Sequence, residues 1–591
     1  MKIYKYLKKK LKNYKKKNDN NKSKCRETTP FNDQKMGTSG LRKKVTVVKQ
    51  ANYAENFIQS VFNSYTPADY ENKSLILGGD GRYYNDVAIK TTIRIAAAHK
   101  VSKIILAENG LMSTPAVSLL IRAQPKGENF GAFIFTASHN PGGPDNDLGF
   151  KFNGPNGAAI PEQMNDRVFE ETKKISEYKI ADYTGDISFT QPSEFEVEHP
   201  DGNKTKMSIV IEPTCKHYIE EMQALFDFDL IKTLFARKDF NFVFDGLHGI
   251  SGPYAKAIFH GIFGVDEKNL FQCDPLPDFG GGHPDPNLVH AHNLVALMDV
   301  FNKNPYACVP DMGCACDGDA DRNMILGPRI LVTPSDSLAV LTNNYELVKA
   351  LSRNGKLAGV ARSMPTSGAV DRVAKKLGLN VYETPTGWKY FGNLLDAGKI
   401  TLCGEESFGT GSDHAREKDG IWAILCWLSI LAQKNKGNTG KFIGINDILG
   451  DHWKTYGRDY YCRYDYEDVP VDKAEVVKGN LAKNFDMFKG LKEGNEACVF
   501  EYHDPVDNSV SKNQGWIYKF PDGSRIVFRV SGTSSANATF RIYFEKHVEP
   551  NGDLWADTNK IIKDGDNLPD LAIKISDLNN VAGRTGPTVI T

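Results

Sequence analysis

A repeated alternation of short apolar runs with amphipathic stretches, beginning near Met36, is the feature that most restricts the fold of this chain. Runs such as Ala132–Phe135, Leu357–Val360 and Thr401–Cys403 read as buried strands, and stretches such as Val87–Ala98 read as helices between them. Strands separated by helices predict parallel sheets that are covered on both faces. Because ligand loops in such sheets follow the carboxyl ends of strands, functional residues are expected directly after the apolar runs.

The pattern changes after about Gly450. Arg525–Val530 and Thr539–Phe544 read as strands with fewer helices between them, which favours an α+β unit with an antiparallel sheet. A chain of 591 residues is too long for one core and predicts about four domains at roughly 150 residues each. We place a basic tail at 1–33 and domains at 34–210, 211–345, 346–445 and 446–591.

The first 24 residues carry eleven lysines and one acidic residue, Asp19. Such a block of like charges is typical of a disordered tail. The alternative is a short basic amphipathic helix, with Ile3, Leu7 and Leu11 near helical spacing, that would suit an anionic membrane surface. Since the whole chain has no net charge, the remainder is acidic, and nucleic-acid binding by the body of the protein is not expected.

Composition bears on location. No run of about 18 apolar residues occurs, so no transmembrane helix is expected. The ten cysteines are scattered and form no pairs at zinc-site spacing. A long chain does not need disulfides, so reduced thiols and a cytoplasmic protein are predicted.

The first candidate loop, residues 136–143, follows the strand that ends at Phe135 and contains Ser138. A serine on a turn after a buried strand is held firmly, and the paired glycines let backbone N–H groups approach an anion. Lys151, a few residues later, is a candidate to neutralise a phosphate or to act as a base, and His139 is the rival base. On its own this loop also fits an ordinary polar turn.

The second candidate loop contains Asp317, Asp319 and Asp321. Three carboxylates at alternating positions of a tight loop can converge on one cation, and oxygen-only ligands favour Mg²⁺. The loop lacks the central glycine and the later glutamate of a calcium-binding EF-hand. We therefore predict one magnesium ion here.

Two further loops have complementary chemistry. Glu405 and Ser407 follow the strand at Thr401–Cys403, and a carboxylate with a hydroxyl suits sugar hydroxyls better than phosphate. Arg529 begins a stretch with hydroxyls and a glycine, and Arg541 follows, which together form a phosphate-binding set.

The four loops read TASHNPGG (136–143), DGDADR (317–322), GEESFG (404–409) and RVSGTSS (529–535), in this order. Together with GTSGLR (37–42), GGDGR (78–82), DGLHG (245–249), ARSMPTSG (361–368), GSDH (411–414) and EKD (417–419), they resemble the α-D-phosphohexomutase superfamily. The eukaryotic phosphoglucomutase branch, parafusin-type members included, is the most similar. The resemblance spans roughly 36–591, and the stretch 534–537 departs slightly from the glycine-richer family pattern.

This resemblance implies three related α/β domains and a C-terminal α+β domain of the TATA-box-binding-like class around a central cleft, each supplying one loop. Ser138 would be the phosphoserine, with Lys151 and His139 beside it, and one Mg²⁺ would be held by Ser138, Asp317, Asp319 and Asp321. Glucose 1-phosphate and glucose 6-phosphate would interconvert through glucose 1,6-bisphosphate. The implied substrate contacts are Thr38, Ser39, Arg42, Arg322, Thr386, Gly387, Glu405, Ser407, Lys418, Arg529, Ser531, Gly532, Thr533 and Arg541.

Two alternatives remain open at this stage. One is a mutase for mannose or N-acetylglucosamine phosphates, because the loop types overlap. The other is a membrane-trafficking phosphoprotein on the same fold, for which the basic tail would supply the contact with the membrane. The sequence leaves monomer or homodimer undecided.

Overall fold

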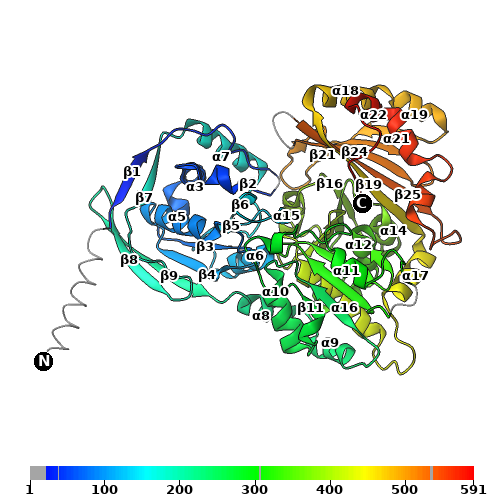
Figure 1. Cartoon of the computed structure of the whole chain (residues 1–591), viewed down its shortest axis with the longest axis horizontal. Helices are drawn as coiled ribbons and strands as arrows, with labels where there is room; N and C mark the ends of the chain where they lie inside the picture. The colour runs from blue at the N-terminus through cyan, green and yellow to red at the C-terminus, as the bar shows by residue number, and fades with distance from the viewer. Residues whose placement is uncertain (1–20, 38, 305–307, 533–536) are drawn as a thin grey trace.

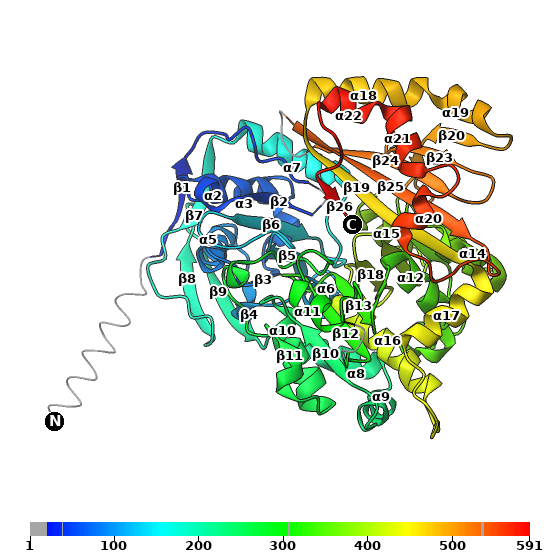
Figure 2. The ribbon, with the colours of Figure 1, turned by 45° about the vertical axis from the view of Figure 1, so that its right-hand side comes forward.

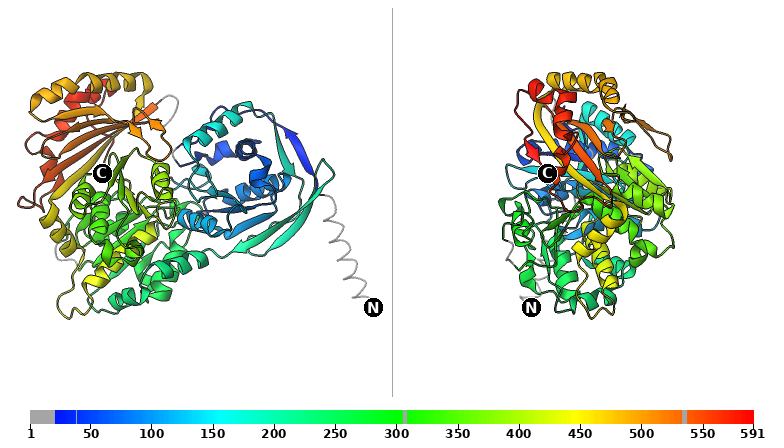
Figure 3. Two further views of the ribbon diagram at one scale, coloured as in Figure 1. Left: turned by 180° about the vertical axis from the view of Figure 1, so that it is seen from behind. Right: turned by 90° about the vertical axis from the view of Figure 1, so that its right-hand side faces the viewer.

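The computed structural model describes residues 21–37, 39–304, 308–532 and 537–591. Four units follow one another along the chain (Figure 1): a blue and cyan unit on one side, two green units beside it, and an orange and red unit above them. Seen from behind, the last unit again stands apart from the first (Figure 3, left). The predicted class, three α/β units followed by an α+β unit, is confirmed.

The first unit is built on a sheet with the strand order β2-β6-β5-β3-β4-β9-β8. Leu75 and Leu77 point into a core shared with α3 and α5, whereas Ile76 points into a core shared with α6, as the alternation of a strand requires. The strands are β2 (Leu41–Lys44), β3 (Ser74–Gly79), β4 (Lys103–Leu111), β5 (Asn129–Phe135), β6 (Asp147–Asn153), β8 (Ser193–Glu198) and β9 (Lys204–Glu212). The helices are α2 (Val45–Val48), α3 (Tyr53–Asn63), α4 (Pro67–Tyr70), α5 (Asn85–Ala98), α6 (Thr114–Ala123) and α7 (Glu162–Lys174).

The second unit has the strand order β11-β10-β12-β13-β14. Its strands are β10 (Phe242–Asp245), β11 (Leu270–Phe271), β12 (Met312–Cys316), β13 (Asn323–Gly327) and β14 (Ile330–Val332). Its helices are α8 (Lys216–Leu225), α9 (Phe228–Phe235), α10 (Ser251–Ala255), the π-helix η1 (Lys256–Ile262), the 3₁₀ turns η2 (Glu267–Asn269) and η3 (Phe279–Gly281), and α11 (His292–Leu297).

The third unit has the strand order β16-β15-β17-β18. Its strands are β15 (Val360–Ser363), β16 (Val381–Thr384), β17 (Leu402–Glu405) and β18 (Gly409–Ser412). Its helices are α12 (Pro334–Asn343), η4 (Tyr345–Leu347), α13 (Lys349–Ser352), α14 (Ala369–Leu377), α15 (Trp388–Asp396), α16 (Gly420–Lys434) and α17 (Ile445–Tyr456). α16 is apolar on nearly all sides, and it is accordingly buried in the core that joins the first three units.

The fourth unit has an antiparallel sheet with the order β20-β23-β24-β25-β19-β26 and a core of its own. Its strands are β19 (Arg458–Pro470), β20 (Glu496–Val499), β23 (Trp516–Lys519), β24 (Arg525–Gly532), β25 (Asn537–Val548) and β26 (Val589–Ile590), with a separate pair β21 (Tyr502–His503) and β22 (Val510–Ser511). Its helices are α18 (Val471–Lys483), α19 (Phe485–Leu491), α20 (Thr558–Lys563), α21 (Leu568–Ser576) and α22 (Leu578–Ala582).

The sheets of the first three units are mixed, although strand–helix alternation predicted parallel ones. In each of them a strand with a parallel neighbour is followed directly, without a crossover helix, by its antiparallel neighbour: β5 by β6, β12 by β13 and β17 by β18. An antiparallel connection needs only a few residues, whereas a parallel one needs a crossover segment. In the fourth unit β24 pairs with β25 in the antiparallel sense. The first three predicted loops therefore lie where a central strand meets its antiparallel neighbour, whereas 529–532 of the fourth loop belong to β24 and 533–535 lie outside the described residues.

The structure corrects the predicted tail. Ser23–Glu27 forms β1, which pairs with β7 (Glu177–Ala181) at the edge of the first unit, so this part of 1–33 is not tail. The pairing uses backbone hydrogen bonds and leaves the side chains of 24–27 exposed, so their polar composition did not reveal it. Residues 1–20, which hold most of the lysines, lie outside the described residues.

Three predicted domain boundaries also fall differently. β9 continues across 210, and α12 packs against β17 and α14 of the third unit. α17 continues across 445 and is separated by one residue from β19, which opens the fourth sheet. The strand predicted at Leu357–Val360 is found at Val360–Ser363. Arg362 and Ser363 are buried in this strand, but their polar side chains do not predict a buried strand from the sequence. In the described part of the chain, no helix has the length and apolar character needed to cross a membrane.

Candidate functional site

Ser138 lies in the turn between β5 and β6 and is buried. Its φ of 54° is in the left-handed region, which residues with a side chain adopt only where the surroundings impose it. The Oγ atom donates a 2.7 Å hydrogen bond to Oδ2 of Asp317, and the backbone N–H donates to Oγ1 of Thr136 at 2.8 Å. The serine is thus anchored from its own turn and from the second unit.

An ion pair beneath the turn fixes its backbone. The buried guanidinium of Arg82 donates to both oxygens of Asp80 and, at 2.9 Å, to the carbonyl of Ser138. The second loop approaches equally closely: a Cβ atom at Gly318 would lie 2.6 Å from the carbonyl oxygen of Ser138. Glycine is therefore required there for the two loops to pack together.

The three aspartates of the second loop form a compact buried cluster. Carboxylate oxygens of Asp317, Asp319 and Asp321 lie within 4.8 Å of one another. Oδ1 of Asp319 and Oδ1 of Asp321 have no hydrogen-bond partner among the described residues. Burial, together with the charges of Asp321 and Asp319, raises the pKa of Asp317 well above its usual value. Unpartnered buried oxygens of this kind fit an oxygen-liganded divalent cation.

Lys151, on β6, faces this cluster. Its Nζ donates to Oδ2 of Asp319 at 2.7 Å and lies 3.5 Å from Oδ2 of Asp321. Burial lowers the pKa of Lys151, but Asp319 and Asp321 outweigh burial and raise it above the ordinary value. The depressed pKa expected of a lysine base is therefore not found in this arrangement. Thr114, which sequence reasoning missed, donates to the same Asp319 oxygen at 2.7 Å.

His139 has the opposite electrostatic setting. Its Nδ1 lies 3.3 Å from Oγ of Ser138. Burial lowers the pKa of His139 far below its usual value, and the cations of Arg322, Arg42, Lys418 and Arg541 lower it further. These cations come from the second, first, third and fourth units, so all four units place positive charge near the serine.

The third loop joins the site through Glu405 and Lys418. Nζ of Lys418 donates to Oε1 of Glu405 at 2.8 Å and lies 3.8 Å from Oδ1 of Asp321. The pKa of Glu405 is lowered because Lys418 outweighs burial, and the side chain of Ser407 hydrogen-bonds to this carboxylate. A backbone bridge between Arg322 and Gly409 ties the second loop to the third.

The fourth loop presents two arginines from neighbouring strands. Arg529 and Arg541 lie directly opposite each other on β24 and β25. Arg529 donates to the hydroxyl of Tyr543 at 3.2 Å, and Nε of Arg541 lies 3.7 Å from Oδ2 of Asp465. Oγ of Ser531 is buried and has no partner among the residues described. Electrostatic interactions couple this pair to the other loops. The charge of Arg541 lowers the pKa of His139, and the charges of Glu406 and Glu405 raise the pKa of Arg529.

The remaining predicted residues are placed as follows. Arg42 donates to Oδ1 of Asn140 at 3.4 Å, Ser39 lies in a turn, Oγ1 of Thr386 is buried without a described partner, Gly387 has a φ of 135° before α15, and Gly532 ends β24. Thr38 and Thr533 lie outside the described residues.

Several supporting residues were not predicted as site residues. Asp285 receives a 3.3 Å hydrogen bond from Arg322, and Glu417 receives one of 2.9 Å from Asn153. Asp80 and Arg82 belong to the motif GGDGR, which offered a signal, whereas Thr114 and Asp285 have no sequence context that sets them apart.

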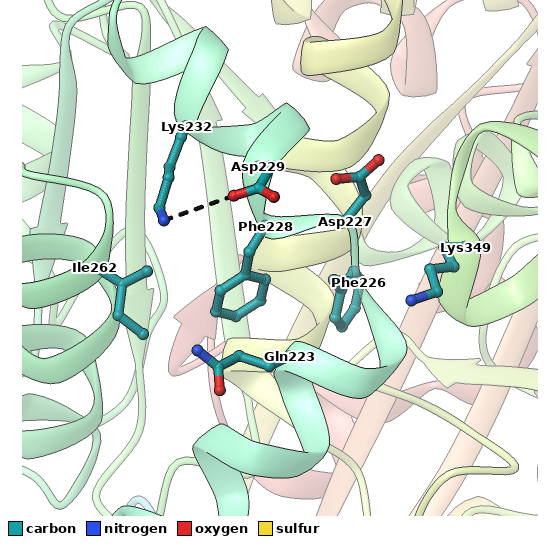
Figure 4. A pocket seen from close by; sticks show the side chains of 8 residues that line it. All are labelled: Gln223, Phe226, Asp227, Phe228, Asp229, Lys232, Ile262 and Lys349. Carbon is teal, nitrogen blue, oxygen red and sulfur yellow. Dashed lines mark ion pairs between the residues drawn. The ribbon is translucent and has the colours of Figure 1, made fainter.

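A surface hollow elsewhere on the second unit contains no predicted site residue (Figure 4). It lies between α8, α9, η1 and α13, and its polar side chains lie around two phenylalanines, with Lys232 paired with Asp229. Its lining residues are Gln223, Phe226, Asp227, Phe228, Asp229, Lys232, Ile262 and Lys349.

Models of known protein families match four consecutive stretches of the chain. Residues 33–179, 216–329 and 334–456 match alpha/beta/alpha domains I, II and III of phosphoglucomutase/phosphomannomutase. Residues 458–588 match the C-terminal domain of phosphoglucomutase-1.

Relatives match over nearly the whole chain. Phosphoglucomutase-2 of Paramecium tetraurelia is 51% identical over 570 residues, which is 95% of this chain and 98% of that protein. A cytoplasmic phosphoglucomutase of Mesembryanthemum crystallinum is 47% identical over 582 residues, 96% of this chain and 98% of its own. The crystal structure of the exocytosis-sensitive phosphoprotein parafusin, a phosphoglucomutase from Paramecium, in its open form, matches with a TM-score of 0.90 at 50% identity, covering 96% of this chain and 99% of that one.

Proposed function

Because the chain belongs to the phosphoglucomutase/phosphomannomutase family, we propose that it is a phosphoglucomutase, an isomerase-class phosphotransferase that interconverts glucose 1-phosphate and glucose 6-phosphate. The observation that carries this proposal is the 2.7 Å contact between the Ser138 hydroxyl and Asp317, beside His139, whose pKa is lowered by burial and by cations from all four units. The relatives named above support glucose as the sugar and the cytoplasm as the location.

Ser138 carries the phosphoryl group in the proposed reaction. The bond between Oγ and phosphorus breaks while a bond forms from phosphorus to the 6-hydroxyl oxygen of glucose 1-phosphate, which loses its proton. The resulting glucose 1,6-bisphosphate turns over within the site. The bond from phosphorus to the sugar O1 then breaks, Oγ of Ser138 takes the phosphoryl group, and O1 regains a proton, which leaves glucose 6-phosphate.

Asp317, Asp319 and Asp321 would hold one Mg²⁺, together with an oxygen of phosphorylated Ser138. The buried, unpartnered Oδ1 atoms of Asp319 and Asp321 support this assignment. When bound, Mg²⁺ supplies positive charge next to the phosphoryl oxygens. Lys151 adds a second positive charge at the Oδ2 atoms of Asp319 and Asp321.

Lys151 and His139 are the two candidates to take the proton of the attacking hydroxyl. The lowered pKa of His139 keeps this side chain neutral beside Ser138. Asp319 and Asp321 raise the pKa of Lys151, so Lys151 must lose its proton before it can act as a base. The pH dependence of kcat separates them: the variant that loses the acidic limb of the profile, Lys151→Met or His139→Gln, identifies the base.

The two outer loops divide the recognition of the substrate. Arg529 and Arg541 would hold the phosphate that is not being transferred, because paired guanidinium groups suit a dianion. Glu405 and Ser407 would hold the ring hydroxyls. This division lets either end of the bisphosphate enter the phosphate site, as the turnover of the intermediate requires.

Intact-mass analysis of the purified enzyme tests the central claim. One phosphate should be present, localise to Ser138 and be lost with excess glucose. Ser138→Ala should carry no phosphate and retain almost no turnover. A variant that keeps most of its activity would refute the phosphoserine assignment.

Mannose or N-acetylglucosamine phosphate remains the alternative substrate class. Turnover of mannose 1-phosphate well above that of glucose 1-phosphate would replace our assignment. A membrane role, suggested by the basic tail and by the name of the parafusin relative, is tested by deleting residues 1–20, which leaves β1 intact. Unchanged binding to anionic vesicles after this deletion would argue against it. The predicted oligomeric state is a monomer or a homodimer, and sedimentation analysis distinguishes the two.

A further inference from the structure

Four residues form a row across the fourth sheet. Val589, Asp465, Arg541 and Arg529 are successive register partners on β26, β19, β25 and β24. Residues directly opposite each other share one face of a sheet. The last strand of the chain is therefore in line with the two arginines that would bind phosphate. Figure 2 shows β26 beside β19, with the C-terminal end near the middle of the molecule.

The row places two like charges opposite each other. Arg529 and Arg541 repel, and an arrangement of this kind is unfavourable without a counter-charge. Asp465 supplies it: its Oδ2 lies 3.7 Å from Nε of Arg541, and its Oδ1 accepts a 2.9 Å hydrogen bond from Nε of Arg463. The Asp465 side chain is only 6% exposed, whereas that of Arg541 is 37% exposed. The carboxylate thus supports Arg541 from the interior and leaves its outer side free for a ligand.

The segment 588–591 holds the backbone on which Asp465 sits. The carbonyl of Asp465 accepts hydrogen bonds from the N–H of Thr588 at 2.7 Å and from its Oγ1 at 2.8 Å. The same Oγ1 accepts a 3.2 Å hydrogen bond from the N–H of Glu467. Arg463 and Thr591 exchange two backbone hydrogen bonds, of 2.7 and 2.9 Å. Asp465 is consequently clamped on both sides by this segment.

We propose that Asp465 is a positioning residue for the phosphate-binding arginines, and that the segment 588–591 is part of the phosphate site because it holds Asp465 in place. This inference rests on the proposed function, in which Arg529 and Arg541 bind the phosphate that is not transferred. That phosphate is bound in the ground state and in the transition state alike. Loss of its positioning should therefore raise KM and leave kcat nearly unchanged.

Asp465→Asn keeps the shape of the side chain and removes its charge. We expect KM for glucose 1-phosphate to rise about tenfold, with kcat within about twofold of wild type. If Asp465 only reduced the positive charge of the site, its removal would strengthen anion binding and KM would fall, which would overturn the proposal. Asp459→Asn is the matched control, because Asp459 is equally buried on the same strand but pairs with Arg372 and His547. It should leave KM unchanged.

Thr588 tests the role of the segment itself. Thr588→Val removes the hydroxyl and keeps the shape, and should raise KM about threefold. Thr588→Ser restores the hydroxyl and should restore KM. Equal KM values for the two variants would refute the role of the segment. Absence of mutase activity in the wild-type enzyme would instead refute the proposed function, so the two failures are distinguishable.

Discussion

Arg525 is a buried polar link between the fourth sheet and the third unit, and its replacement should weaken the contact between them. From β24, Nε donates to Oε2 of Glu545 at 2.6 Å, NH2 donates to the carbonyl of Thr366 at 2.6 Å, and NH1 donates to the carbonyl of Met364 and to Glu383. The side chain is 7% exposed. The small apolar cluster that also joins the two units contains Met364 and three residues of the fourth sheet. The ion pair between Arg372 and Asp459 is a further polar link between them.

Arg525→Met removes one cation and leaves without it the buried carboxylate of Glu545, the partly exposed carboxylate of Glu383 and two carbonyls. Removing one partner of a buried ion pair costs about 3–5 kcal/mol. Burial already raises the pKa of Glu545 against the opposing effect of Arg525, so protonation of Glu545 should limit the loss to about 3 kcal/mol. For a unit of this size, that corresponds to a decrease of roughly 12 °C in its melting temperature.

Differential scanning calorimetry measures this decrease for the transition of the fourth unit. The double variant Arg525→Met/Glu545→Gln should recover about half of it, because the unpaired charge is gone. Lys478→Met is the control: Lys478 pairs with the exposed Glu475 on α18 and should change the melting temperature very little. A decrease below about 3 °C for the single variant, or simple addition in the double variant, would refute the reasoning.

Three further predictions concern the site and its surroundings. Lys151→Met should lower kcat by about 10²- to 10⁴-fold in initial-rate assays, and a near-normal kcat would remove Lys151 from the chemistry. Chelation of divalent cations should stop turnover and added Mg²⁺ should restore it, while Asp319→Asn should need at least about tenfold more Mg²⁺; activity that persists in chelator would contradict the magnesium assignment. Burial raises the pKa of Asp336 from 3.8 to about 6. The folded state therefore binds this proton more tightly than the unfolded state, and stability falls as pH rises from about 4 to 6. Asp336→Asn should be more stable than wild type at pH 8 by up to about 3 kcal/mol and equal to it near pH 4, as judged by urea denaturation; equal stability at pH 8 would show that burial does not perturb Asp336.

Local sequence was sufficient for the class of fold and for the four loops. Each loop is a run rich in polar and glycine residues at or directly after the end of a buried strand, a pattern that near neighbours in the chain define. The order of these motifs was also enough to identify the family, which the domain matches confirm. The roles of individual residues in the loops remain proposals.

Other features depended on the tertiary structure. Ser138 and Asp317 are 179 residues apart, and Thr114 reaches Asp319 from a distance of 205 residues. Strand pairing alone brings Asp465 beside Arg541 and brings Thr588 to the backbone of Asp465. The raised pKa of Lys151 also could not be predicted from the sequence, because burial and two carboxylates from another unit determine it. Periodicity and turn chemistry act between near neighbours in the chain, whereas burial and electrostatic fields are sums over whatever packing brings together.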